Sequence, residues 1–196
     1  MAFRRFCLFI ALFLPLASPA ADLDGVQLED RVVVDGQPLQ LNGIGLRTRY
    51  FFKVYVAGLY LPYKAASAQA AIDGGGAKRI VLVMRRDATA EQFCDSIDAG
   101  LRANNSERQL AEVKAQTDAL YGMIRAEARA HEGMKIVLDY APSANATTLY
   151  ADGRPLGPAM AGEPFFRALL RIWLGERPVQ SDLKELLLGE RQTAAN

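Results

Sequence analysis

The segment RTRYFFKVYVAGLYL, residues 47–61, constrains the fold more than any other part of the chain. Its even-numbered positions include Tyr50, Phe52, Val54, Val56 and Tyr60, and its odd-numbered positions include Phe51, Tyr55, Ala57, Leu59 and Leu61. Successive side chains of a strand point to opposite faces, so both faces of this segment are apolar. Such a strand has to be covered on both sides. We therefore predict one long strand here, at the centre of a sheet.

Further strands are predicted around this segment. Asp35-Gly36 and Asp152-Gly153 each stand between β-rich runs and are typical of tight hairpin turns. Residues 78–86 and 134–140 are apolar runs with charged flanks, and they also predict strands.

Helices are predicted in separate blocks, which favours an α+β fold with a mainly antiparallel sheet over strict β-α alternation. Residues 67–72 indicate a short helix that ends at Gly74-Gly75-Gly76. Thr89 and Ser106 are each followed three residues later by Gln, the pattern of a capping box at a helix start. Two more helices are expected, one after Pro164 and one capped by Ser181.

The chain divides into three predicted parts: residues 1–20 as a cleaved secretory signal peptide, 21–190 as one domain, and 191–196 as a loose tail. Arg4 and Arg5 precede an apolar run, and small residues follow at the predicted cleavage point. Pro15 breaks the run before it reaches the roughly 20 residues that a membrane-spanning helix needs. We therefore expect an exported protein without stable membrane insertion.

The charge of the chain is nearly balanced, with 23 basic and 22 acidic residues. Removal of the signal peptide takes two arginines and leaves the balance close to zero. No nucleic acid or anionic membrane surface is therefore expected as a partner. Cys94 is the only cysteine of the expected mature chain and lies on the apolar stripe of a predicted helix, so a buried structural thiol is expected. His131 lacks a spaced set of ligands, and neither a metal site nor a cofactor is expected.

Two sequence motifs occur as a pair. Residues 41–61 contain Gly-x-Arg followed by Phe-Lys-x-Tyr-x-x-Gly-Leu-Tyr-Leu, and residues 165–189 contain Trp-Leu-Gly-x-x-Pro-Val-x-x-x-Leu-Lys. Together they resemble the chalcone isomerase superfamily, specifically its bacterial, exported chalcone-isomerase-like branch. The resemblance implies an open-faced β-sandwich, in which a large sheet carries helices on one side with a ligand cleft between. It also implies a periplasmic location.

Relatives in this superfamily include plant enzymes that close a chalcone to a flavanone and non-catalytic proteins that bind fatty acids. The catalytic arginine of the enzymes is matched by Arg47. The first catalytic threonine aligns with Tyr55, and the tyrosine aligns with Phe93, which has no hydroxyl group. The asparagine aligns with Gly100 and the second threonine with Ile172.

Four of these five positions depart from the enzymes. Removing one polar group from a desolvated site costs about 1–3 kcal/mol, and a rate falls about tenfold per 1.4 kcal/mol. We therefore expect the chain to lack ring-closing chalcone isomerase activity. What remains is Arg47 with Tyr55, and Lys53 and Tyr60 as further candidates on the same segment. A guanidinium that faces an apolar cleft suits a carboxylate.

The preferred hypothesis is a pocket for a small amphipathic anion such as a fatty acid, with Arg47, Tyr55, Phe93 and Ile172 as ligand-binding residues. One alternative is an isomerase of the intramolecular lyase type, in which Arg47 and Tyr55 stabilise an enolate formed from an enone. Another is a structural or interaction protein that has kept the fold without a ligand. For Arg47 itself, the simpler alternative is that it only pairs with an acidic neighbour at the strand edge. Arg49 shares the strand parity of Arg47, and a bulge would turn only one of them inward. Trp173, at helical spacing from the phenylalanines near it, is expected in the core.

Overall fold

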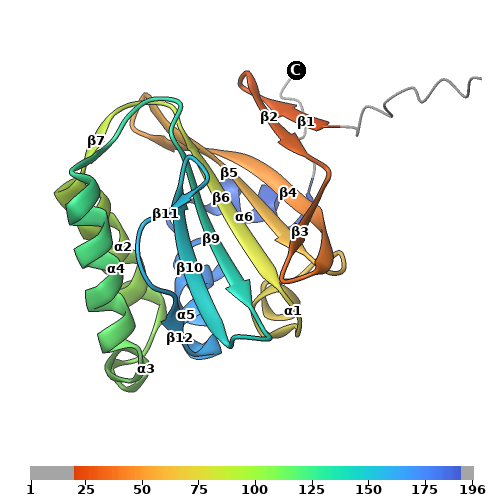
Figure 1. Ribbon diagram of the computed structural model, residues 1–196. Helices are drawn as coiled ribbons and strands as arrows, with labels where there is room; N and C mark the ends of the chain where they lie inside the picture. The colour runs from red at the N-terminus through yellow and green to blue at the C-terminus, as the bar shows by residue number, and fades with distance from the viewer. Residues whose placement is uncertain (1–19, 191–196) are drawn as a thin grey trace, which may run out of the picture.

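A curled antiparallel sheet with helices on one side forms the body of the molecule (Figure 1). The structure is a computed structural model and describes residues 20–190. In spatial order the eight-stranded sheet contains β11 (Arg154–Pro155), β10 (Ala146–Ala151), β9 (Lys135–Ala141), β6 (Lys78–Met84), β5 (Phe52–Leu61), β4 (Gln37–Arg49) and β3 (Arg31–Val34), with β12 (Met160–Ala161) paired to β10. Every pairing between these strands is antiparallel. The predicted α+β fold with a mainly antiparallel sheet is confirmed.

Strand β5 is covered on both faces, as its composition predicts. Ala57 and Leu59 belong to the apolar cluster under the helices, whereas Val56 and Tyr60 belong to a second cluster on the opposite face. The single long strand predicted for residues 47–61 is wrong at its N-terminal end. Residues 47–49 are the end of β4, and a turn separates them from β5. Apolar alternation does not reveal this turn because the turn residues are themselves aromatic.

Asp-Gly pairs make the hairpins. Both predicted turns, Asp35-Gly36 and Asp152-Gly153, connect adjacent strands with positive φ at both residues, the backbone that such turns require. A third pair, Asp24-Gly25, joins β1 (Ala20–Leu23) to β2 (Val26–Glu29) in the same way. This N-terminal hairpin was not predicted from the sequence, although its turn contains the same Asp-Gly pair as the two predicted hairpins. It contributes Val26 and Leu28 to the second apolar cluster.

The helices are α1 (Ala68–Asp73), α2 (Ala90–Asn104), α3 (Glu107–Glu112), α4 (Lys114–Glu127), α5 (Glu163–Leu174) and α6 (Ser181–Leu187). Both predicted capping boxes are present, at Thr89 for α2 and at Ser106 for α3. The helix after Ser106 is divided at Val113 into α3 and α4. Ser181 is the first residue of α6 and not its cap, which is Gln180. Just before α2, the short strand β7 (Ala88–Thr89) pairs with β8 (Arg129–Ala130).

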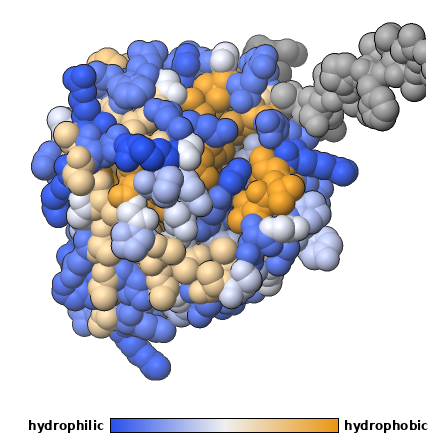
Figure 2. Space-filling view, viewed as in Figure 1, coloured by the Kyte–Doolittle hydropathy of each residue, from blue (hydrophilic) through white to orange (hydrophobic). Residues whose placement is uncertain are grey.

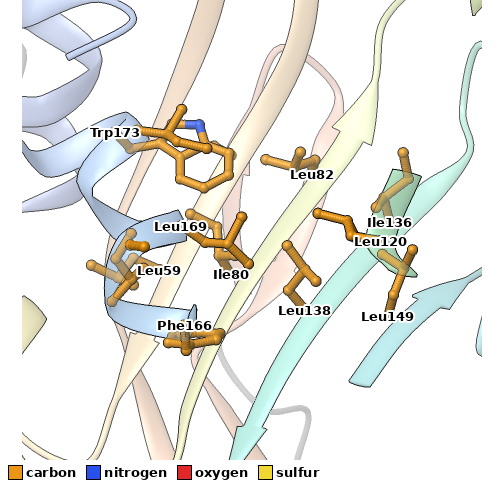
Figure 3. Close-up of a cluster of buried hydrophobic side chains, with 14 of the residues drawn as sticks. Leu59, Ile80, Leu82, Leu120, Ile136, Leu138, Leu149, Phe166, Leu169 and Trp173 are labelled. Atoms are coloured by element: carbon orange, nitrogen blue, oxygen red, sulfur yellow. The ribbon is translucent and has the colours of Figure 1, made fainter. Parts of the chain in front are cut away.

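The main core lies between the sheet and α5. Figure 3 shows Phe166, Leu169 and Trp173 of α5 facing Leu59 and Ile80 of the sheet. Each large apolar side chain that is fully buried contributes roughly 1.5–3 kcal/mol to folding. The expected core position of Trp173 and the expected burial of Cys94 are confirmed, at 4% and 2% exposure.

The face of the sheet away from α5 and α6 is turned to the viewer in Figures 1 and 2. Figure 2 shows hydrophobic side chains in patches over this face, surrounded by hydrophilic ones. Among residues 20–190, no helix is long and apolar enough to cross a membrane. The predicted signal peptide and the predicted loose tail lie outside the described residues, apart from Ala20, which begins β1.

Candidate functional site

A cavity of about 350 Å³ opens between one end of the sheet and helices α2 and α5. This volume lies within the range of roughly 300–1,000 Å³ that is usual for small-molecule sites. Arg47, Tyr55, Phe93 and Ile172, the four residues proposed from the sequence, all line it. The lining is completed by Arg49, Tyr50, Phe52, Val54, Leu82, Met84, Arg86, Asp87, Ala88, Gln92, Ser96, Ile97, Trp173 and Val179.

Arg47 is half-buried near the end of β4, directly opposite Tyr55 of β5 in the sheet register. Its Nη1 donates to Oε1 of Gln180 at 2.9 Å and also to the carbonyl oxygen of Thr48. Gln180 Oε1 in turn accepts a hydrogen bond from the Thr48 backbone N–H at 2.8 Å. Its Nε2 donates to the carbonyl oxygen of Leu46 at 3.2 Å. The segment before α6 therefore holds the guanidinium at the cavity through neutral groups.

No carboxylate lies within 4.0 Å of the Arg47 guanidinium in the part of the chain that the structure describes. The acidic partner that a purely structural role of Arg47 would require is therefore not found within residues 20–190, and the amide of Gln180 takes its place. A half-buried guanidinium beside apolar walls retains its positive charge, because arginine does not deprotonate in proteins.

Tyr55 is 9% exposed, and its phenolic oxygen accepts a hydrogen bond from Nε1 of Trp173 at 2.9 Å. Burial raises the pKa of Tyr55, and the Trp173 hydrogen bond and the Arg47 charge offset only part of this effect. The phenol is therefore neutral at physiological pH. Its own hydrogen has no acceptor among residues 20–190, so it remains available as a donor beside Arg47.

The mouth of the cavity is basic. Arg49 and Arg86 are both exposed there, and Asp87 is the one acidic residue of the lining. The Arg49 guanidinium carbon is 5.9 Å from the centre of the Tyr50 ring, and that of Arg86 is 4.7 Å from the centre of the Phe52 ring. The sheet register shifts between Arg47 and Thr48, yet Arg47 and Arg49 both line the cavity. The irregularity does not turn only one of them inward.

The inner walls of the cavity are apolar. Phe93 of α2 and Ile172 of α5 present a ring and an aliphatic side chain to the cavity. Gly100 is not part of the lining. A Cβ atom built on Gly100 would lie 2.7 Å from Cγ2 of Ile172, so α2 and α5 meet too closely there for an asparagine.

Several residues singled out from the sequence lie elsewhere. Lys53 pairs with Asp24, and the Tyr60 hydroxyl donates to the carbonyl oxygen of Glu29 on the opposite face of the sheet, so neither lines the cavity. His131 is exposed, 3.6 Å from Asp152. No cluster of three or more potential metal ligands is found within residues 20–190.

Two contributors were missed by sequence reasoning. Gln180 had no signal beyond its position two residues after Pro178 in the second motif. Arg86 ends a predicted strand, and its position at the cavity follows only from the fold.

A wider groove of about 600 Å³ lies near β1, β4 and α6, and charged residues of both signs line it, including Asp30, Arg31, Lys64 and Glu190. It lies outside the space between the sheet and the α2–α5 pair. The smaller cavity is the better candidate because apolar walls and convergent donors occur together there.

The fold and the site together define an α+β protein in which an arginine-bearing apolar cavity lies between a curled antiparallel sheet and its helices. The chalcone isomerase-like family model matches residues 20–189, and the chain belongs to this family. The predicted resemblance is thereby confirmed.

The structure is similar to that of a fatty-acid binding protein from Arabidopsis thaliana, with a TM-score of 0.68. The alignment covers 87% of this chain and 96% of the plant protein, at 14% sequence identity. At this level of identity the likeness shows a shared fold. No curated protein sequence matches the chain.

Proposed function

We propose that the protein binds a small amphipathic anion, such as a fatty acid, in the cavity between the sheet and helices α2 and α5. The anionic group lies against Arg47 and Tyr55, and the apolar part lies against Phe93 and Ile172. The observation that carries this proposal is the half-buried Arg47 guanidinium, which faces an apolar cavity and is held by Gln180 instead of a carboxylate.

The chemistry of the two donors fits a carboxylate. Arg47 supplies a fixed positive charge, and the neutral phenol of Tyr55 supplies an O–H donor on the neighbouring strand. Charge-assisted hydrogen bonds of this kind contribute about 1.5–3 kcal/mol each. The fatty-acid binding protein with the same fold supports the choice of ligand class.

We also propose that the protein lacks the ring-closing activity of the plant enzymes and requires no cofactor. Phe93 and Ile172 supply no hydroxyl group, and Gly100 is packed against α5. Export through a cleaved signal peptide to the periplasm is proposed from residues 1–20 together with the family membership.

The test is a titration with oleate, with decanoate and decanol as a charged and an uncharged probe of equal chain length. Trp173 is the only tryptophan and lines the cavity, so its fluorescence reports occupancy. Native mass spectrometry of protein purified without detergent identifies any molecule that travels with it. Arg47→Ala is expected to weaken decanoate binding by about tenfold or more and to leave decanol binding nearly unchanged.

Arg31→Ala is the matched control, because Arg31 lines the wider groove and not the cavity. If Arg31→Ala removes binding and Arg47→Ala does not, the proposed site is wrong. If no fatty acid binds, enone substrates followed by absorbance test the isomerase alternative. A turnover that disappears in Arg47→Ala would then replace the binding function, because Arg47 and Tyr55 also suit an enolate oxygen.

A further inference from the structure

The turn between β4 and β5 exposes three consecutive aromatic residues. Tyr50, Phe51 and Phe52 are 84%, 100% and 59% exposed. In the part of the chain that the structure describes, the only other large hydrophobic side chains of comparable exposure are Val33 and Tyr63, and neither has such a neighbour beside it in sequence. A fully exposed phenylalanine contributes no burial free energy to folding. A contiguous exposed apolar cluster of this kind indicates an interaction surface.

Basic residues surround the aromatic turn. Arg49 and Arg86 stand beside it, and neither has a carboxylate within 4.0 Å among residues 20–190. Lys53 and Arg85 are paired with Asp24. The acid nearest the two free arginines along the chain is Asp87, which accepts a hydrogen bond from the backbone of Glu132. The turn therefore carries local positive charge although the chain as a whole is nearly neutral.

The aromatic turn also borders the mouth of the cavity. Tyr50 and Phe52 line the cavity, as do Arg49 and Arg86, whereas Phe51 is fully exposed and is not part of the lining. In Figure 1 the β4–β5 turn lies at the end of the sheet beside β7, whose Ala88 lines the same cavity. A surface that covers the turn would therefore face the cavity opening.

We propose that Tyr50, Phe51 and Phe52 dock the protein on an anionic membrane surface, with Arg49 and Arg86 against the lipid headgroups and the cavity mouth toward the bilayer. Aromatic rings and arginines together suit the interfacial region, where apolar and anionic groups lie within a few ångströms of each other. A short protruding turn enters such a surface without a complementary groove. Exchange of a lipid anion between bilayer and cavity rests on the proposed function, but docking does not.

This partner differs from the expectation drawn from total charge, which gave no indication of an anionic membrane surface. Total charge averages over the molecule, whereas adsorption depends on the charge within about 10 Å of the surface. The arginines at the turn satisfy this local requirement.

The test is a flotation assay with vesicles of phosphatidylglycerol and phosphatidylcholine in equal parts. The full chain is expressed, and the protein that the cell produces from it is purified without detergent. Phe51→Ser is expected to lower the vesicle partition constant about tenfold, because one phenylalanine side chain withdrawn from water accounts for about that factor. Tyr63→Ser is the matched control, because Tyr63 is 80% exposed but follows the opposite end of β5. Circular dichroism checks that both variants fold.

Binding should also fall in pure phosphatidylcholine vesicles and at high salt, where surface charge is screened. The proposal is overturned if the unmodified protein does not float, if Phe51→Ser floats equally well, or if anionic lipid makes no difference. It is also overturned if neither the unmodified protein nor any variant binds vesicles and light scattering shows that the unmodified protein self-associates but Phe51→Ser does not. That result would make the turn an interface between copies of the chain. Decanoate affinity in solution should be the same in Phe51→Ser, so a failure of docking is distinguishable from a failure of ligand binding.

Discussion

Nε1 of Trp173 donates a hydrogen bond to the phenolic oxygen of Tyr55 at 2.9 Å and so joins helix α5 to strand β5 at the wall of the cavity. The bond satisfies the indole N–H, which is buried on a side chain that is 4% exposed. It also fixes the phenol so that its hydrogen is directed elsewhere. The same contact therefore closes the core and orients a donor of the proposed site.

Tyr55→Phe should lower the free energy of unfolding by about 1–2 kcal/mol, because it leaves the Trp173 N–H without its acceptor. Urea unfolding followed by circular dichroism measures this cost without depending on tryptophan fluorescence. Trp173→Phe and the double variant complete a mutant cycle. A coupling free energy near zero would show that the hydrogen bond contributes nothing to stability.

Gln180 is the positioning residue for Arg47. Replacing it by Ala or by Glu distinguishes the effect of the guanidinium's position from the effect of its charge on ligand binding. Gln180→Ala should weaken decanoate binding several-fold because the guanidinium loses one of its two anchors. Gln180→Glu should weaken it more, by about tenfold or beyond, because a carboxylate next to Arg47 competes with the anionic ligand. Isothermal titration of both variants measures the difference. Tighter binding to Gln180→Glu than to Gln180→Ala would contradict a role for Arg47 in holding an anion.

The sequence predicts the sheet and its hairpins well because β5 and the Asp-Gly turns carry strong local signals. Local sequence patterns do not place the four proposed site residues in one cleft. That prediction comes from the family resemblance alone. Three details depend on tertiary contacts that no local pattern encodes. Gln180 reaches β4 across a long separation in the chain, Arg86 comes to the cavity with the end of β6, and the turn at Phe51 interrupts an apolar run that reads as one strand.

The close contact between α2 and α5 at Gly100 limits the side chains that this position accepts. Gly100→Ala gains helix propensity, about 1 kcal/mol, but its Cβ would meet Ile172 at 2.7 Å, and such overpacking costs about 1–3 kcal/mol. We expect a net loss of stability, and a larger loss for Gly100→Asn. Gly122→Ala in α4 is the control, because its Cβ would meet nothing within 4 Å. That variant should be stabilised. Thermal unfolding compares the two, and an equal gain in both would show that α5 moves aside freely.

Lys78 is the most deeply buried charge of the described chain, at 1% exposure, and its partner is Glu163 at 3.4 Å. Its Nζ also lies 5.7 Å from the centre of the Tyr140 ring. Removal of one member of a buried ion pair costs about 3–5 kcal/mol when it leaves the other charge buried without a partner. Glu163 is 29% exposed in its side chain, so Glu163→Gln should cost somewhat less, about 2–3 kcal/mol. Lys78→Met should cost less than Glu163→Gln, because the Glu163 carboxylate that remains is partly exposed and keeps Arg167 as a partner at 3.1 Å.

The pH dependence of stability provides a second readout for this pair. Burial lowers the pKa of Lys78 below its usual 10.5, so the unfolded chain holds the proton more tightly than the folded one. The contribution of Lys78 to the free energy of unfolding therefore rises with pH from its folded pKa up to about 10.5. Lys78→Met should remove this rise in urea unfolding measured at neutral and mildly alkaline pH.

Glu107→Gln is the matched control for Glu163→Gln. Glu107 is the first residue of α3, so this variant also loses a carboxylate at a helix start, and it should cost about 0.5 kcal/mol. If Glu163→Gln costs no more than Glu107→Gln, the buried lysine does not depend on its partner.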